Sequence, residues 1–198
     1  MAVKKNARGY GATVLCFMLI LGCGGLRYSQ LAPEVKEFRP KRVGVLPADV
    51  GIYEEARGVM EDIIAGELVR RKWFQSVVAA DTINRQFQIN EEMRKIVREY
   101  VAKLKTVNFS DPELSKRIGE LAQVDAFLVV NVDYWQYAME NRDKIAKVGM
   151  GVKMIDADTG IVMWKASHHE TQTYKWIKPE LPTVANKLAS MMIDEIPH

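Results

Sequence analysis

The chain has 198 residues, with 28 Lys and Arg against 25 Asp and Glu and a formal net charge of +3. Three of the basic residues lie within residues 1–22, which contain no acidic residue, so residues 23–198 are formally neutral. This balance excludes the clustered basic excess of a nucleic-acid-binding protein, and the length suits one domain with its own hydrophobic core.

The amino terminus has the pattern of a secretory signal. Basic residues at positions 4, 5 and 8 precede an apolar run over residues 12–21, and the small residue Gly22 stands immediately before Cys23. The apolar run is well short of the ~20 residues that a helix needs to span a bilayer.

Residues 20–23, Ile-Leu-Gly-Cys, resemble the lipobox of bacterial lipoproteins, which implies cleavage before Cys23 and lipidation of its sulfur. An ordinary cleaved signal or an uncleaved anchor is the alternative. With Cys16 removed and Cys23 alkylated, neither a disulfide nor a thiol nucleophile would remain. We therefore expect a signal peptide over 1–22, a lipidated cysteine and tether over 23–40, and one domain over 41–198.

The first half of that domain alternates short strands with helices. Residues 42–46 favour an apolar strand, 53–72 a helix and 74–80 a second strand. From Ile89 to Leu104, apolar residues recur at helical spacing opposite a charged face. The next helix starts at Ser110 or Asp111, either of which can act as its cap, and ends near residue 124.

The second half is dominated by longer strands. Residues 127–130 are apolar without alternation, which is typical of a central strand covered on both faces. Residues 144–156 alternate apolar and polar, and residues 161–173 form their antiparallel partner before a final helix over 181–196. The expected fold is a single α/β domain of two or three layers. Its mixed sheet would combine parallel core strands with a C-terminal antiparallel hairpin, and helices would pack on it.

Several short sequence segments resemble those of envelope lipoproteins related to the curli secretion-channel protein and the lipoprotein activators of penicillin-binding proteins. The segments are Arg-Val-Gly-Val-Leu-Pro at 42–47, Arg-Lys-Trp-Phe at 71–74, Gln-Val-Asp-Ala-Phe-Leu at 123–128 and Lys-Met-Ile-Asp-Ala-Asp-Thr-Gly-Ile-Val-Met-Trp at 153–164. The resemblance implies a fold similar to the amino-terminal domain of Tol-system protein B. With Gly24 after the cysteine, it also implies a lipid anchor on the periplasmic face of the outer membrane.

No residue pattern predicts catalysis, a metal or a cofactor. His168 and His169 are neighbours on a predicted strand, so their side chains point to opposite faces and cannot share one ion. The tripeptide Asp158-Thr159-Gly160 matches aspartic proteases, but it occurs once and such chemistry needs two carboxylates. A hairpin turn explains it more simply.

Aromatic residues gather in the last third of the chain. Trp135 and Tyr137 share one face of their strand, Tyr134 points the other way, and Trp176 lies in the loop before the last helix. Trp135, Tyr137 and Trp176 are therefore candidate interaction residues, with burial in the core as the alternative. The loop around Trp176 is either pinned to the core or a docking segment.

These features favour a non-enzymatic outer-membrane lipoprotein that serves as an interaction or assembly module of a secretion, transport or envelope-maintenance complex. Its partners would be the membrane, through the lipid, and an envelope protein. The alternative is a pore-forming subunit of the curli-export type, which requires a homo-oligomer. A third hypothesis is a small-ligand carrier, which would need an apolar cavity between helices and sheet.

Overall fold

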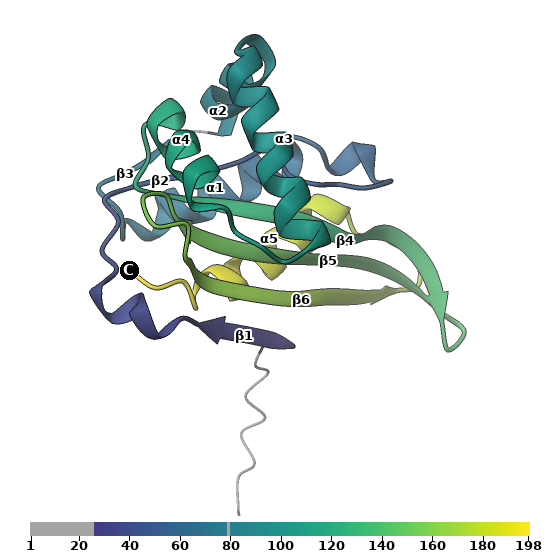
Figure 1. Ribbon diagram of the computed structural model, residues 1–198. Helices are drawn as coiled ribbons and strands as arrows, with labels where there is room; N and C mark the ends of the chain where they lie inside the picture. The colour runs from purple at the N-terminus through teal and green to yellow at the C-terminus, as the bar shows by residue number, and fades with distance from the viewer. Residues whose placement is uncertain (1–25, 79) are drawn as a thin grey trace, which may run out of the picture.

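The computed structural model describes residues 26–78 and 80–198, so Cys23 and the expected signal peptide lie outside the described residues. One mixed sheet lies between two layers of helices (Figure 1). The strands are β1 (Tyr28–Leu31), β2 (Arg42–Val45), β3 (Ser76–Val78), β4 (Ala126–Glu140), β5 (Asp143–Asp156) and β6 (Val162–Tyr174). The α-helices are α1 (Val59–Arg71), α2 (Ala80–Ile89), α3 (Glu91–Thr106), α4 (Pro112–Ala122) and α5 (Leu181–Ile193).

The strand order β1-β6-β5-β4-β2-β3 divides the sheet into two parts. β2 pairs in parallel with both β3 and β4, whereas β4, β5, β6 and β1 pair antiparallel in succession. The expected α/β fold with parallel core strands and a C-terminal antiparallel hairpin is therefore confirmed.

Helices cover the two faces of the sheet unequally. On the first face, α1 and α5 pack against β2, β4, β5 and β6 and form the larger core. On the second face, α2, α3 and α4 form a smaller core with the start of β4 and the end of β5, and Val78 of β3 and Val162 of β6 pack at its margin. Within β4, Phe127 and Val129 enter the smaller core and Leu128 and Val130 the larger, which confirms a central strand buried on both faces.

The register of β5 follows the predicted alternation. Ala146, Val148, Met150, Val152 and Met154 all face the α1–α5 core. The intervening residues are lysines and glycines, which suit the second face because no described apolar cluster covers it there. None of the described helices has the length and hydropathy required to cross a bilayer.

Two helix boundaries differ from those predicted. α1 begins at Val59 because Gly58 adopts a φ of 77°, and the Glu61 carboxylate accepts the Gly58 N–H at 2.8 Å. Residues 54–56 form a separate 3₁₀ turn. The helix predicted from Ile89 begins instead at Glu91, because the Asn90 side chain accepts the Met93 N–H and caps α3, and Ile89 is the last residue of α2. Ile89, predicted to be buried, is 77% exposed.

The segment expected to be a tether contains regular structure. Tyr28–Leu31 form β1 at the edge of the sheet, paired with Trp164–Ser167 of β6, and Pro33–Glu37 form a 3₁₀ helix. Four residues are too few for a periodic signal, and their pairing depends on a strand more than 130 positions away. The expected tether over 23–40 is therefore wrong from Tyr28 onward.

Candidate functional site

The far end of the antiparallel strands carries the most exposed apolar side chains near the predicted interaction residues. The β4–β5 hairpin turns at Asn141 and Arg142, and β6 ends beside it because Tyr174 pairs with Lys144 (Figure 1). The loop 175–180 then returns the chain to α5. We name this end the tip surface and define it by Tyr137, Met139, Trp176, Ile177 and Lys178.

Two apolar residues in the loop are almost fully open to solvent. Trp176 is 95% exposed and Ile177 is 86% exposed, while Met139 on the hairpin is 70% exposed. Single exposed apolar residues are ordinary, but two consecutive ones on a loop at the same end of the sheet as a third form a surface that gains free energy when a partner covers it. Tryptophan is also enriched among the residues that dominate binding energy at interfaces.

The loop is nevertheless held in place at its far side. The Tyr137 hydroxyl donates a hydrogen bond to the Pro179 carbonyl oxygen at 2.8 Å, and the Lys178 ammonium lies 3.4 Å from the centre of the Tyr137 ring. Tyr174 meets the same ring edge-on, with 6.2 Å between ring centres. Tyr137 therefore fixes the base of the loop and leaves Trp176 and Ile177 projecting.

The three predicted interaction residues have different environments. Trp135 is only 4% exposed and packs in the α1–α5 core, so for this residue the core alternative holds. Tyr137 shares the Trp135 face, as predicted, but contacts the loop, and Trp176 is exposed. The sequence left two alternatives for the loop, attachment to the core or exposure for docking. In the structure, Tyr137 holds Pro179 at the end of the loop, while Trp176 is exposed to solvent.

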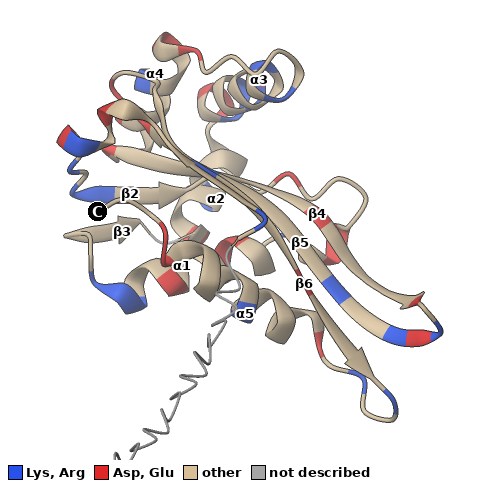
Figure 2. Ribbon diagram, turned by 90° about the horizontal axis from the view of Figure 1, so that it is seen from below, with Lys and Arg blue, Asp and Glu red and all other residues tan. Residues whose placement is uncertain are grey.

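Charged residues lie at the end of the β4–β5 hairpin and in the loop after β6, as Figure 2 shows. Lys175 and Lys178 flank Trp176 and Ile177 directly in the chain. On the hairpin, the Lys147 ammonium pairs with the Glu140 carboxylate at 2.8 Å. Sequence reasoning missed Met139, because its exposure depends on the long hairpin projecting past the helices.

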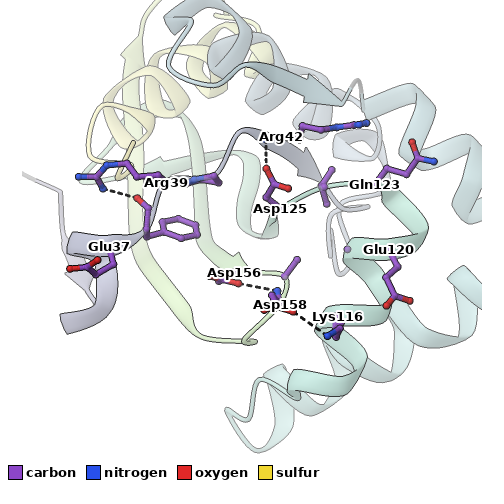
Figure 3. A pocket seen from close by; sticks show the side chains of 14 residues that line it. Glu37, Arg39, Arg42, Lys116, Glu120, Gln123, Asp125, Asp156 and Asp158 are labelled. Carbon is purple, nitrogen blue, oxygen red and sulfur yellow. Dashed lines mark hydrogen bonds and ion pairs between the residues drawn. The ribbon is translucent and has the colours of Figure 1, made fainter.

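A second candidate is a depression of about 640 Å³ at the amino ends of β2 and β4 (Figure 3). Its acidic side chains support local structure. The Asp125 carboxylate accepts the N–H groups of Lys41 and Arg42, both at 2.9 Å, and the Asp156 carboxylate accepts two N–H groups of the β5–β6 turn. Lys116 pairs with Asp158 at 3.3 Å. We assign these groups to turn and strand stability.

The paired histidines have different neighbours, although their ring centres lie 5.9 Å apart. His168 accepts the Arg27 N–H through Nδ1 at 3.0 Å, while His169 meets Tyr134 edge-on on the second face of the sheet. Burial is the main cause that lowers the pKa of His169. Within residues 26–78 and 80–198, no three His, Cys, Asp or Glu side chains are placed to hold a metal ion.

Two solved structures share this architecture. PelC from Paraburkholderia phytofirmans, described as a dodecamer, is 17% identical over 86% of this chain and 98% of its own, with a TM-score of 0.54. Lipoprotein GNA1162 from Neisseria meningitidis is 15% identical over 79% of this chain and 97% of its own, also with a TM-score of 0.54.

The chain therefore shares its fold with PelC and with lipoprotein GNA1162. No protein-family model matches the sequence, and no curated protein matches it significantly. At these identities the likeness concerns the arrangement of helices and strands, since a shared fold hosts many functions.

Proposed function

We propose that the chain is a non-enzymatic envelope lipoprotein that docks a membrane-bound protein partner through the tip surface. Lipidation at Cys23 would anchor it to the periplasmic face of the outer membrane. The main support for this proposal is the exposure of Trp176 and Ile177 on a loop that Tyr137 holds in place. A pre-ordered apolar surface binds with a smaller loss of conformational entropy than a mobile one.

The lipid anchor and the tip surface would act together. Lipid attachment raises the effective concentration of the domain near any partner in the same membrane, so a modest contact area suffices. The fold likeness to lipoprotein GNA1162 supports an envelope setting. A partner with an apolar pocket fits the tip surface best, because its most exposed apolar side chains are those of Trp176, Ile177 and Met139.

The docking proposal can be tested by crosslinking in native membranes. We expect the double variant W176A and I177A to lose its main crosslinked partner by about tenfold or more, as for other exposed aromatic anchors. The matched control is V69A with I89A, two exposed apolar residues on α1 and α2 that are not part of the tip surface. An unchanged partner yield would overturn the proposal. Loss of membrane retention with crosslinks intact would assign the surface to lipid and also overturn it.

The anchor is tested separately. We expect metabolic palmitate labelling of the native protein, loss of the label in Cys23→Ala, and accumulation of the unprocessed chain under globomycin. An unlabelled wild-type protein would contradict lipidation at Cys23. The docking test above does not depend on this result, because it compares variants that all retain the same amino terminus.

A second candidate function is a ring-forming subunit of a secretion channel of the curli-export type. The observation that favours it is the shared fold with PelC, which forms a dodecamer. The exposed edge strand β1, whose four residues are all exposed, offers backbone groups for pairing between copies. Native mass spectrometry of detergent extracts distinguishes the two functions, because a ring supports the second and a monomer excludes it.

A further inference from the structure

A cavity of about 340 Å³ lies between the carboxy-terminal end of α3 and the second face of the sheet. Its walls come from three places in the chain: Asp49 and Gly51 after β2, residues 101–108 of α3 and the turn after it, and the middle of β4 with Lys153 of β5. Figure 1 shows this end of α3 lying over β4 and β5. The volume is near the lower end of the range for small-molecule sites.

One wall of the cavity is apolar. Val101 and Leu104 project from α3, and Val129 lines the opposite side from β4. Leu104 and Val129 belong to the smaller core, so this wall is a continuation of packed hydrophobic structure. An apolar group placed here would be removed from water.

Lys153 is the basic lining residue that has no carboxylate partner among the described residues. It is half-buried, and it forms no ion pair with any residue in the described part of the chain. In the sheet it stands directly opposite Lys165 on β6, and like charges at such positions destabilise a sheet. Burial, and then the charge of Lys165, lowers the pKa of Lys153.

The acidic groups at the cavity already have partners. The Asp49 carboxylate pairs with the Lys105 ammonium at 2.6 Å and accepts the Gly51 N–H at 3.2 Å. The Lys105 hydrogen bond is the main reason that the pKa of Asp49 lies below its usual range. Asp133 accepts the Asn131 side-chain amide at 2.7 Å and is exposed, so water screens its charge more than that of Lys153.

We propose that this cavity binds a small organic anion, a carboxylate with a short apolar chain, with the Lys153 ammonium as its counter-charge. The apolar chain would lie against Val101, Leu104 and Val129, and the carboxylate would relieve the repulsion between Lys153 and Lys165. This site shares no residue with the tip surface, so a negative result for either proposal leaves the other unaffected.

The test uses the full-length protein in non-ionic detergent, titrated calorimetrically with hexanoate and, as the matched cation, with hexylamine. We expect saturable binding of hexanoate and at least about tenfold weaker binding of hexylamine. Lys153→Met keeps the apolar stem and removes the charge, and should weaken hexanoate at least about tenfold. Lys95→Met, at an exposed lysine on α3 outside the cavity, should leave the affinity unchanged.

A second variant guards against misfolding of the first. Val101→Phe narrows the cavity and leaves Lys153 in place, so it should also weaken hexanoate while thermal unfolding shows a folded protein. Binding that is equal in wild type, Lys153→Met and Val101→Phe would overturn the site. So would the absence of saturable binding in the wild type, or equal affinity for hexylamine.

Discussion

Asp111 illustrates how one side chain joins two helices. Its Oδ1 accepts the N–H groups of Glu113 and Leu114 and caps α4, while Oδ2 receives the Lys103 ammonium of α3 at 2.8 Å. The sequence left Ser110 and Asp111 as alternative caps. Ser110 instead contacts the Tyr100 hydroxyl at 2.7 Å, and burial raises the pKa of Tyr100 to about 12.

Removing the Asp111 side chain should weaken the protein measurably. We expect Asp111→Ala to lower the free energy of unfolding by about 1 kcal/mol, because the first-turn N–H groups of α4 lose their acceptor. Urea unfolding followed by circular dichroism measures the change. A stability equal to that of the wild type would contradict the capping role.

The charge of Asp111 should appear in the pH dependence of stability. The Lys103 hydrogen bond is the largest cause that lowers the pKa of this carboxylate in the folded protein. Its stabilising contribution is therefore present above about pH 4 and is lost as the pH falls through the folded pKa. We expect Asp111→Asn, which can still cap the helix, to lose less stability on acidification than the wild type. An equally steep loss in both proteins would exclude the ion pair as the cause.

At the scale of elements, β4 and the loop after β6 place two tryptophans in opposite environments. Trp135 is 4% exposed in the larger core, and Trp176 is 95% exposed. We expect Trp135→Ala to lower the free energy of unfolding by about 3–5 kcal/mol, because it leaves a cavity, and Trp176→Ala to change it by less than about 0.5 kcal/mol. Parallel urea titrations compare the two, and similar losses would refute the assignment of Trp176 to a free surface.

At the scale of the molecule, two cores share the central strand β4, so they should unfold together. Leu68 of α1 lies in the larger core and Ile118 of α4 in the smaller one, and both are fully buried. We expect Leu68→Ala and Ile118→Ala each to cost about 2–5 kcal/mol and to shift one cooperative transition. Tryptophan fluorescence and far-ultraviolet circular dichroism should give coincident curves. Separate transitions would indicate two independently folding parts.

Local patterns in the sequence sufficed for much of the fold. The alternation from Ala146 to Met154 defines the core face of β5, and the polar cap with Pro112 marks the start of α4. These signals are local because side-chain direction in a strand and hydrogen bonding at a helix end depend on near neighbours in the chain. The order of strands from β2 onward followed from them, whereas β1 did not.

Only the tertiary structure decided which residues are available for function. The sequence grouped Trp135, Tyr137 and Trp176, but burial depends on which distant segments pack against each one: α1 and α5 cover Trp135, and none of the described cores covers Trp176. Pairing of Tyr28–Leu31 with β6, and the cavity beside Lys153, likewise join positions far apart in the chain. Local propensity carries no information about such contacts, because their free energy arises only when the sheet and both helical layers are assembled.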